Sequence, residues 1–379
     1  MKPANAPVMV FHCPFPVSER TLHSANMARP VRMLEGFKLA GYRVIQITGD
    51  ARQRRTRIAR LKRLIGRGLA ISFVYSETAN LPLFFNEKNR LPIFPFMEYR
   101  FFHWLRKKKI PIGLFLRDLH WRFPQFRHYA LYKRLPALLF YRLDWQLYMS
   151  RCDRLFLPSV GLGEHLPTKP RASISVLPPG CESRVPRALI PVAESGMSRL
   201  GLSLFYVGGV TAPPYNLMPI FGCAAKLPDE SVTICCRRDE WLKAKSSYAG
   251  SLSGNVHIVH AQGEELDRYY RAADLFIFTL EPCEYNTLAL PFKIFEAITH
   301  MLPILTFAGS ETARWVQEEG AGWVVQDLAD LIALIGRLRE NPDLIAEKRL
   351  HLHELAGKHS WTNRALSVAE ALGAGKVPR

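Results

Sequence analysis

A lysine and a glutamate three residues apart are the side chains of this sequence best suited to binding a phosphorylated sugar. Lys293 and Glu296 follow Pro291 and precede the apolar segment 304–307. On a helix this spacing puts both side chains on one face near the N-terminus, where free N–H groups and the helix dipole favour an anion. Lys293 can then hold a phosphate while Glu296 accepts hydrogen bonds from hydroxyl groups. The pair suits a nucleotide diphosphate sugar; the other interpretation is an ordinary surface ion pair.

Asp118 is a candidate general base because of its position. It follows the apolar segment 112–116 and Arg117, and polar groups at the carboxyl end of a strand lie where open α/β sheets bind ligands. A carboxylate there can remove a proton from an attacking hydroxyl group. The alternatives are a helix N-cap or an ion pair with Arg117. His120 is a second candidate base or a structural histidine, and residues 76–78, after the predicted strand 71–75, should face the same cleft.

Two further segments fit the recognition of a diphosphate. Gly208 and Gly209 follow an apolar strand, 204–207, and the absence of side chains lets their backbone approach a ligand closely. Arg237 follows the predicted strand 231–235, where its guanidinium can contact the diphosphate. No D-x-D motif lies in a suitable loop, so we expect no bound metal and no cofactor besides the donor substrate.

Length and composition limit the class of protein. With 379 residues, 48% of them hydrophobic, the chain is long enough for two α/β cores. The seven cysteines include no C-x-x-C pair, so neither a zinc site nor a disulfide framework is indicated. The apolar run at residues 8–11 is too short for a signal peptide, and no later window reaches the length that spans a bilayer. We expect a cytoplasmic protein with peripheral membrane contact.

The predicted elements divide into two halves. A strand at 8–11, a helix at about 24–39 and a strand at 42–47 form a βαβ unit without G-x-G-x-x-G, which argues against a dinucleotide-binding dehydrogenase. In the second half strands and helices alternate again, with a helix expected at 264–272. The predicted linker is residues 186–198. The predicted domains are 1–190, 199–357 and a terminal helical segment, 358–379.

Positive charge is concentrated in the first half. Residues 1–190 contain 33 Lys and Arg against 11 Asp and Glu, or +22, while the remaining residues contain 18 and 22, or −4. This asymmetry predicts a polyanionic partner, either an anionic lipid surface or a nucleic acid. Residues 52–67 form a basic amphipathic pattern, and residues 98–109 combine aromatic and basic side chains, both typical of a membrane interface. The alternative is that the apolar stripe of 52–67 packs on its own domain.

The order of these features resembles the GT-B glycosyltransferases. Their donor-site helix has the pattern P-x-K-hydrophobic-x-E, matched by residues 291–296, followed by a proline and a strand. Met301 stands where these proteins usually have glycine, and Leu288 stands where many retaining members have the first of two glutamates. Asp118 and Lys293 also resemble the base and the diphosphate-binding lysine of the glucuronosyltransferase of xanthan assembly and related bacterial polysaccharide glycosyltransferases.

This resemblance implies an α/β GT-B fold with two Rossmann-like domains facing a cleft and a C-terminal helix that returns to the first domain. It implies a glycosyltransferase that moves a sugar from a UDP-sugar to a lipid-linked glycan at the cytoplasmic membrane face. The enzyme would be a hexosyltransferase, and the resemblance to the xanthan enzyme adds glucuronosyltransferase as one option. Asp118 would be the base of an inverting reaction, and Gly208, Gly209, Arg237, Lys293 and Glu296 would bind the donor. The alternatives are a retaining GT-B enzyme, a basic nucleic-acid-binding protein and a catalytically silent GT-B subunit.

Overall fold

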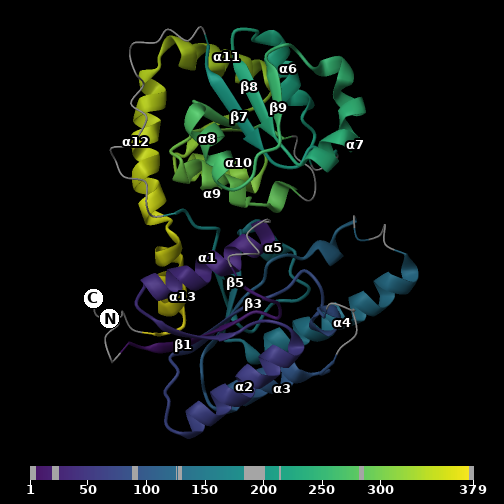
Figure 1. Cartoon of the computed structure of the whole chain (residues 1–379), viewed down its shortest axis with the longest axis vertical. Helices are drawn as coiled ribbons and strands as arrows, with labels where there is room; N and C mark the ends of the chain where they lie inside the picture. Colours follow the sequence, from purple (N-terminus) through teal and green to yellow (C-terminus); the bar gives the residue numbers. More distant parts are fainter. Residues whose placement is uncertain are drawn as a thin grey trace. The chain divides into compact units, whose positions relative to one another are not determined.

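The computed structural model describes residues 6–18, 25–87, 93–124, 126, 130–182, 201–212, 215–280 and 286–374. The chain divides into two compact units, one formed by Met1–Pro178 with Trp361–Arg379 and the other by Pro179–Ser360. Each unit contains one six-stranded sheet in which all neighbouring strands are parallel (Figure 1). The predicted linker, 186–198, lies outside the described residues.

The first unit has the strand order β2-β1-β3-β4-β5-β6. Its strands are β1 (Val8–His12), β2 (Arg43–Ile47), β3 (Phe73–Glu77), β4 (Ile112–Phe115), β5 (Arg154–Leu157) and β6 (Ser173–Val176). Strands β1, β3 and β4 are buried along their whole length, as expected for a parallel sheet covered on both faces. The strand order reverses between β1 and β3, so the carboxyl ends of these two strands mark the position at which such sheets bind ligands.

Helices cover both faces of this sheet. They are α1 (Ala25–Leu39), α2 (Ala51–Gly66), α3 (Met97–Lys107), α4 (Leu131–Arg151), the short α5 (Gly161–Glu164) and α13 (Trp361–Ala371). Figure 1 shows α1 and α13 on one face and α2, α3 and α4 on the other. Helix α13 packs on α1, and a Cβ atom on Gly36 would lie only 2.4 Å from the carbonyl oxygen of Trp361. Glycine at position 36 therefore permits this close approach of the C-terminal helix.

The second unit has the order β12-β11-β10-β7-β8-β9. Its strands are β7 (Ser203–Val207), β8 (Ser231–Cys235), β9 (Val256–Val259), β10 (Leu275–Phe278), β11 (Ile304–Phe307) and β12 (Gly322–Val325). The helices are α6 (Met218–Lys226), α7 (Arg238–Tyr248), α8 (Glu264–Ala272), α9 (Phe292–Thr299), α10 (Glu311–Glu318), α11 (Leu328–Glu340) and α12 (Asp343–Lys358). Apolar side chains of β7, β10 and β11 form its core with α6, α9 and α11. The order reverses between β7 and β10.

The predicted fold class, two Rossmann-like units with a C-terminal helix that returns to the first unit, is confirmed. Among the helices in the described part of the chain, none is both long and apolar enough to cross a bilayer.

Candidate functional site

In the second unit, the residues predicted to bind a donor follow strands that meet at the reversal of strand order. Gly208 and Gly209 come directly after β7, Arg237 comes two residues after β8, and α9 follows β10. Because all these strands are parallel, their carboxyl ends lie at one edge of the sheet, where α/β units bind their ligands. Lys293 and Glu296 lie in the first two turns of α9, after the N-cap residue Pro291.

Lys293 and Glu296 form a partly exposed ion pair that a buried tyrosine holds in place. The distance from Lys293 Nζ to Glu296 Oε2 is 2.6 Å, and each side chain is 29% exposed. Tyr270 Oη, on α8, donates to the same carboxylate oxygen over 3.0 Å. The Tyr270 ring stacks on His300, with 4.6 Å between ring centroids. Glu296 is therefore oriented from two sides, and the ammonium of Lys293 keeps further N–H donors for an anion.

The end of β8 lies close enough to Lys293 for the two to interact electrostatically. Burial raises the pKa of the Cys235 thiol, and the charge of Lys293 partly opposes that rise. Cys235 Sγ donates to Ala261 O over 3.4 Å, so the thiol is bonded inside the unit.

The glycine loop after β7 is fixed by side chains from within the unit. Tyr206 Oη donates to Gly209 O over 2.6 Å, and Val210 N donates to Glu240 Oε1 over 2.9 Å. A Cβ atom on Gly209 would lie 2.4 Å from the Tyr215 ring. The space that glycine leaves at this position is thus filled by Tyr215, a structural requirement that the sequence pattern did not reveal.

Gly209→Ala is expected to destabilise the second unit, because the new methyl group must displace the Tyr215 ring. Overpacking of this kind costs about 1–3 kcal/mol, and we expect a melting temperature lower by about 2–12 °C. Differential scanning calorimetry measures the change. In a Tyr215→Ala background the same Gly209→Ala change should cost much less stability than it does in the wild type. An equal cost in both backgrounds would show that the ring is not the obstacle.

Arg237 lies on the surface at the start of α7. It is exposed and serves as the N-cap residue of that helix, in extended conformation. Glu240, one turn further along α7, bonds the glycine loop at Val210 N. Arg237 therefore lies one helical turn from the residue that bonds this loop, in a position that suits a ligand contact.

Asp118 lies in the first unit, beyond the carboxyl end of β4. Its Oδ2 is 3.7 Å from His120 Nδ1, and the two side chains are 25% and 30% exposed. Tyr141 Oη donates to Asn80 O over 2.6 Å, so it can accept from His120 Nε2, 3.1 Å away. That tautomer leaves the Nδ1 lone pair of a neutral imidazole facing Asp118. Burial lowers the pKa of His120, and the charge of Asp118 opposes this effect.

Residues 76–78 do not line an open site as predicted. Ser76 and Glu77 are 1% exposed and belong to β3. Glu77 Oε2 accepts from Arg117 Nη2 over 3.2 Å, and Thr78 Oγ1 accepts from Arg117 N over 3.0 Å. The prediction was wrong because these polar groups bond inward. They fix Arg117, and through it the backbone that carries Asp118.

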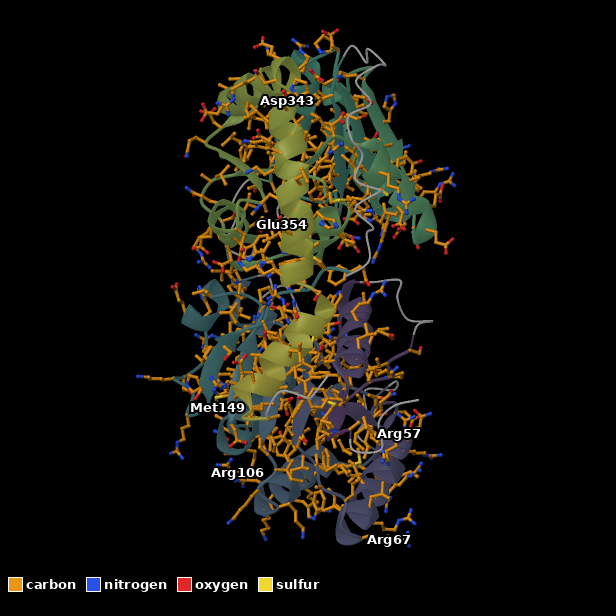
Figure 2. All side chains as sticks on the ribbon, turned by 90° about the vertical axis from the view of Figure 1, so that its left-hand side faces the viewer. Arg57, Arg67, Arg106, Met149, Asp343 and Glu354 are labelled. Atoms are coloured by element: carbon orange, nitrogen blue, oxygen red, sulfur yellow. The ribbon has the colours of Figure 1, made fainter. Side chains whose placement is uncertain are left out.

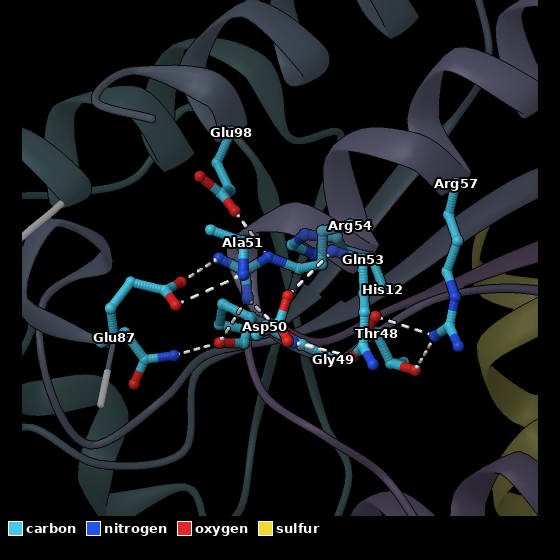
Figure 3. Close-up of polar contacts among 12 residues, drawn as sticks. His12, Thr48, Gly49, Asp50, Ala51, Gln53, Arg54, Arg57, Glu87 and Glu98 are labelled. Atoms are coloured by element: carbon cyan, nitrogen blue, oxygen red, sulfur yellow. Dashed lines mark hydrogen bonds and ion pairs between the residues drawn. The ribbon is translucent and has the colours of Figure 1, made fainter. Parts of the chain in front are cut away.

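Helix α2 uses its apolar stripe within the first unit, which favours the second interpretation of residues 52–67. Ile58 and Leu61 are buried. Arg54 is buried as well, at 2% exposure. It pairs with Glu98 Oε1 at 2.8 Å and with Glu87 Oε1 at 2.9 Å and also bonds two backbone carbonyls in the loops that follow β1 and β2 (Figure 3).

The remaining charges of α2 and α3 lie on the outside of the unit. Figure 2 marks Arg57, Arg67 and Arg106 there. The exposed basic residues of α2 and its C-cap are Arg52, Arg55, Arg57, Arg60, Lys62, Arg63 and Arg67. The predicted aromatic anchors Phe101 and Phe102 are each 1% exposed and belong to the core. These helices thus offer positive charge to a partner but few apolar side chains.

Arg54→Ala is expected to lower the stability of the first unit by about 3–5 kcal/mol, because it leaves two buried carboxylates without their cation. Arg60→Ala, on the exposed face of the same helix, is the matched control and should change stability by less than about 0.5 kcal/mol. Urea denaturation followed by far-UV circular dichroism compares them. Equal stabilities would contradict the buried pairing.

Within the residues that the structure describes, no group of three or more His, Cys, Asp or Glu side chains is arranged to hold a metal ion.

The sequence pattern missed two residues that position the site. Tyr270 and Tyr141 lie far from Glu296 and His120 along the chain, and a buried tyrosine within a helix gives no local signal of its hydrogen-bond partner.

Comparison with known proteins agrees with this geometry. Residues 206–341 match the family model of glycosyl transferases group 1. A search of curated proteins returned no match. Among solved structures, Anabaena HepE in complex with UDP and glucose is 12% identical, with 97% of this chain and 99% of that chain covered and a TM-score of 0.59.

Two sugar-phosphate enzymes are similar to the same extent. The sucrose-phosphate synthase of Thermosynechococcus elongatus is 11% identical, with 96% and 98% covered and a TM-score of 0.58. The UDP-forming α,α-trehalose-phosphate synthase of Burkholderia xenovorans, in complex with glucose-6-phosphate, is 11% identical, with 97% and 100% covered and a TM-score of 0.59. At these identities the structures show a shared GT-B fold. The family match lies within the second unit.

Proposed function

We propose that this protein transfers a hexose from a UDP-sugar, bound by its second unit, to a lipid-linked glycan acceptor bound by its first unit. The observation that carries the proposal is the pair of Lys293 and Glu296 in the first turns of α9, after the strand at which the order of the second sheet reverses. This pair lies inside the segment that matches the glycosyl transferase family. One solved neighbour of the same fold is described with UDP and glucose.

In the donor site, each residue has a distinct role. Lys293 binds the diphosphate and stabilises the charge that builds on it as the glycosidic bond breaks. Glu296 accepts hydrogen bonds from hydroxyl groups of the sugar or ribose, in the orientation that Tyr270 fixes. The Gly208-Gly209 backbone and Arg237 border the phosphates. Because cationic side chains and N–H groups supply the stabilising charge, the proposed reaction needs no metal.

In the acceptor site, Asp118 removes the proton of the attacking hydroxyl group, and the reaction inverts the anomeric carbon. Its carboxylate is partly exposed and lies beyond a buried strand end, where an acceptor can reach it. His120 is the neighbouring group that can share the proton. A retaining reaction is the second candidate, because a trehalose-6-phosphate synthase of the same fold is described as transferring with retention.

The charge of the first half supports a lipid-linked acceptor and a place at the cytoplasmic face of the plasma membrane. The count of +22 in residues 1–190 gives this half an affinity for anionic lipid. Such glycans serve in the synthesis of exopolysaccharide or cell-surface polysaccharide. A nucleic acid is the other polyanion that this charge can bind.

Turnover tests the proposal. The purified protein is incubated with UDP-glucose, UDP-galactose, UDP-N-acetylglucosamine or UDP-glucuronic acid and with bacterial lipid extract, and UDP release and glycolipid are measured. Extract-dependent UDP release with one donor is expected, and the anomeric configuration of the product, read by NMR, separates inversion from retention. Donor binding without release would support a silent subunit, and steeply salt-dependent RNA binding without donor binding would support the nucleic-acid alternative.

A further inference from the structure

The first half of α4 exposes apolar side chains on the side where a surface helix normally carries polar ones. Leu131, Tyr132, Leu135 and Leu139 are 60%, 74%, 61% and 55% exposed. Residues 131, 135 and 139 are spaced four apart, so they lie on one face of the helix, and Tyr132 lies beside them. We call these four residues the α4 apolar face.

This face is not the one that α4 packs into the first unit. The buried residues of α4 are Tyr141, Asp144, Trp145, Leu147 and Tyr148, which lie on the opposite side of the helix at 100° per residue. The inner side is also anchored by hydrogen bonds, since Asp144 accepts from Leu83 N and from Tyr99 Oη, each over 2.8 Å. The helix is therefore apolar on both sides, a pattern that indicates a second partner for the outer side.

Basic residues accompany the α4 apolar face. Lys133 and Arg142 are exposed, and Lys133 Nζ lies 5.4 Å from the centroid of the Tyr132 ring. In the described part of α4, the one acidic residue, Asp144, is buried on the other side. Leucine and tyrosine with flanking cations suit the boundary between acyl chains and anionic headgroups. An acidic groove of a partner protein would complement the positive charge. It would not explain why the tyrosine and the three leucines lie on one exposed face of the helix.

The position of this face also fits a lipid-linked acceptor. Helix α4 runs from the loop after β4 back to β5, so its first half lies toward the carboxyl ends of the strands, along the outer side of the first unit in Figure 1. Tyr141, two residues beyond Leu139, bonds His120, the neighbour of Asp118. At a rise of about 1.5 Å per residue, all four residues of the α4 apolar face lie within about 15 Å of Tyr141 along the helix axis.

We infer that the α4 apolar face inserts into the headgroup boundary of an anionic lipid bilayer and so brings the first unit to its acceptor. This step rests on the proposed function for its purpose but not for its test, because insertion is measured without donor or turnover. It assigns insertion to α4, whereas the outer faces of α2 and α3 supply long-range charge attraction. The two contributions differ in their dependence on salt.

The test is flotation of the full-length protein with vesicles of phosphatidylcholine containing about 30% phosphatidylglycerol, a composition chosen to give the negative surface that attracts basic proteins. The triple variant Leu131→Gln, Leu135→Gln, Leu139→Gln is compared with Leu242→Gln, Leu350→Gln, which changes two exposed leucines of the second unit. Because all five leucines are exposed, both variants should keep the wild-type circular dichroism and melting temperature.

We expect the triple variant to bind these vesicles at least 100-fold more weakly, since each leucine should contribute about tenfold or about 1.4 kcal/mol. The control variant should bind as the wild type does. In about 1 M salt the Debye length is near 3 Å, so wild-type binding should weaken. Some salt-resistant binding should remain in the wild type, and the triple variant should lack it. A fluorophore on Leu135→Cys should shift to the blue with vesicles.

Three results would overturn the inference. They are equal vesicle binding by the triple variant and the wild type, a probe at position 135 that remains in water, and a wild-type dimer in the absence of vesicles that the triple variant abolishes. The last would show that a second copy of the chain covers this face. Loss of turnover with intact insertion would instead count against the proposed reaction.

Discussion

Replacing Asp118 with asparagine is expected to lower the rate of sugar transfer by about 100- to 10,000-fold, the usual contribution of a general base. The amide has nearly the shape of the carboxylate but cannot take the proton of the acceptor hydroxyl. Asp118 lies in the first unit and Lys293 in the second, so the affinity for the donor nucleotide should not change. Initial rates with saturating donor and acceptor, with nucleotide affinity by calorimetry, separate these effects.

His120→Gln is the matched control for this prediction, because His120 Nδ1 lies 3.7 Å from Asp118 Oδ2. If Asp118 is the base, the His120 variant should keep more activity than Asp118→Asn. If the two losses are reversed, His120 is the base and Asp118 its positioning residue. Unchanged transfer by Asp118→Asn would contradict an inverting reaction that uses this carboxylate and would favour retention.

Lys293→Ala should weaken binding of the donor nucleotide by about 10- to 100-fold, because a hydrogen bond to a charged group contributes about 1.5–3 kcal/mol. The lost contact is to the diphosphate, so the variant should bind UDP much more weakly but UMP almost as well as the wild type does. Tyr270 still donates to Glu296 in the variant, which keeps the carboxylate oriented. Isothermal titration calorimetry with UDP and UMP measures both affinities.

Lys245→Ala, an exposed lysine on α7 of the same unit, controls for general loss of positive charge and should bind UDP normally. Lys293→Arg retains the charge and should lie between Lys293→Ala and the wild type. An equal loss of UDP and UMP affinity in Lys293→Ala would mean that this lysine supports the fold of the site rather than the diphosphate.

The elements of the second unit could be read from sequence because each has a strong local pattern. The helix expected at 264–272 is α8, and the strand expected at 304–307 is β11. Continuous apolar runs bounded by turns are typical of buried parallel strands. Met301, at the usual glycine position, has a φ of 55°, so the glycine preference there reflects a left-handed backbone that a methionine adopts at some cost.

The direction in which polar side chains point could not be read from sequence. Arg54 has the same local pattern as Arg55, yet it is buried between Glu87 and Glu98, partners 33 and 44 residues away. Glu77 likewise follows an apolar run but turns inward to Arg117. Phe101 and Phe102 are core residues beside a run of lysines. In each case tertiary packing, which a local pattern does not contain, decides which side faces water.

The most direct test of the account is the thermal stability of the purified protein with UDP, GDP, ADP, CMP and the corresponding sugar nucleotides, with Lys293→Ala alongside. A ligand that binds the native state raises the melting temperature of the protein. At a ligand concentration of one hundred times the Kd, the free energy of unfolding rises by about 2.7 kcal/mol. We predict a rise with UDP and one UDP-sugar that is largely lost in Lys293→Ala. No rise with any nucleotide, or an equal rise in the variant, would contradict a donor site built on α9.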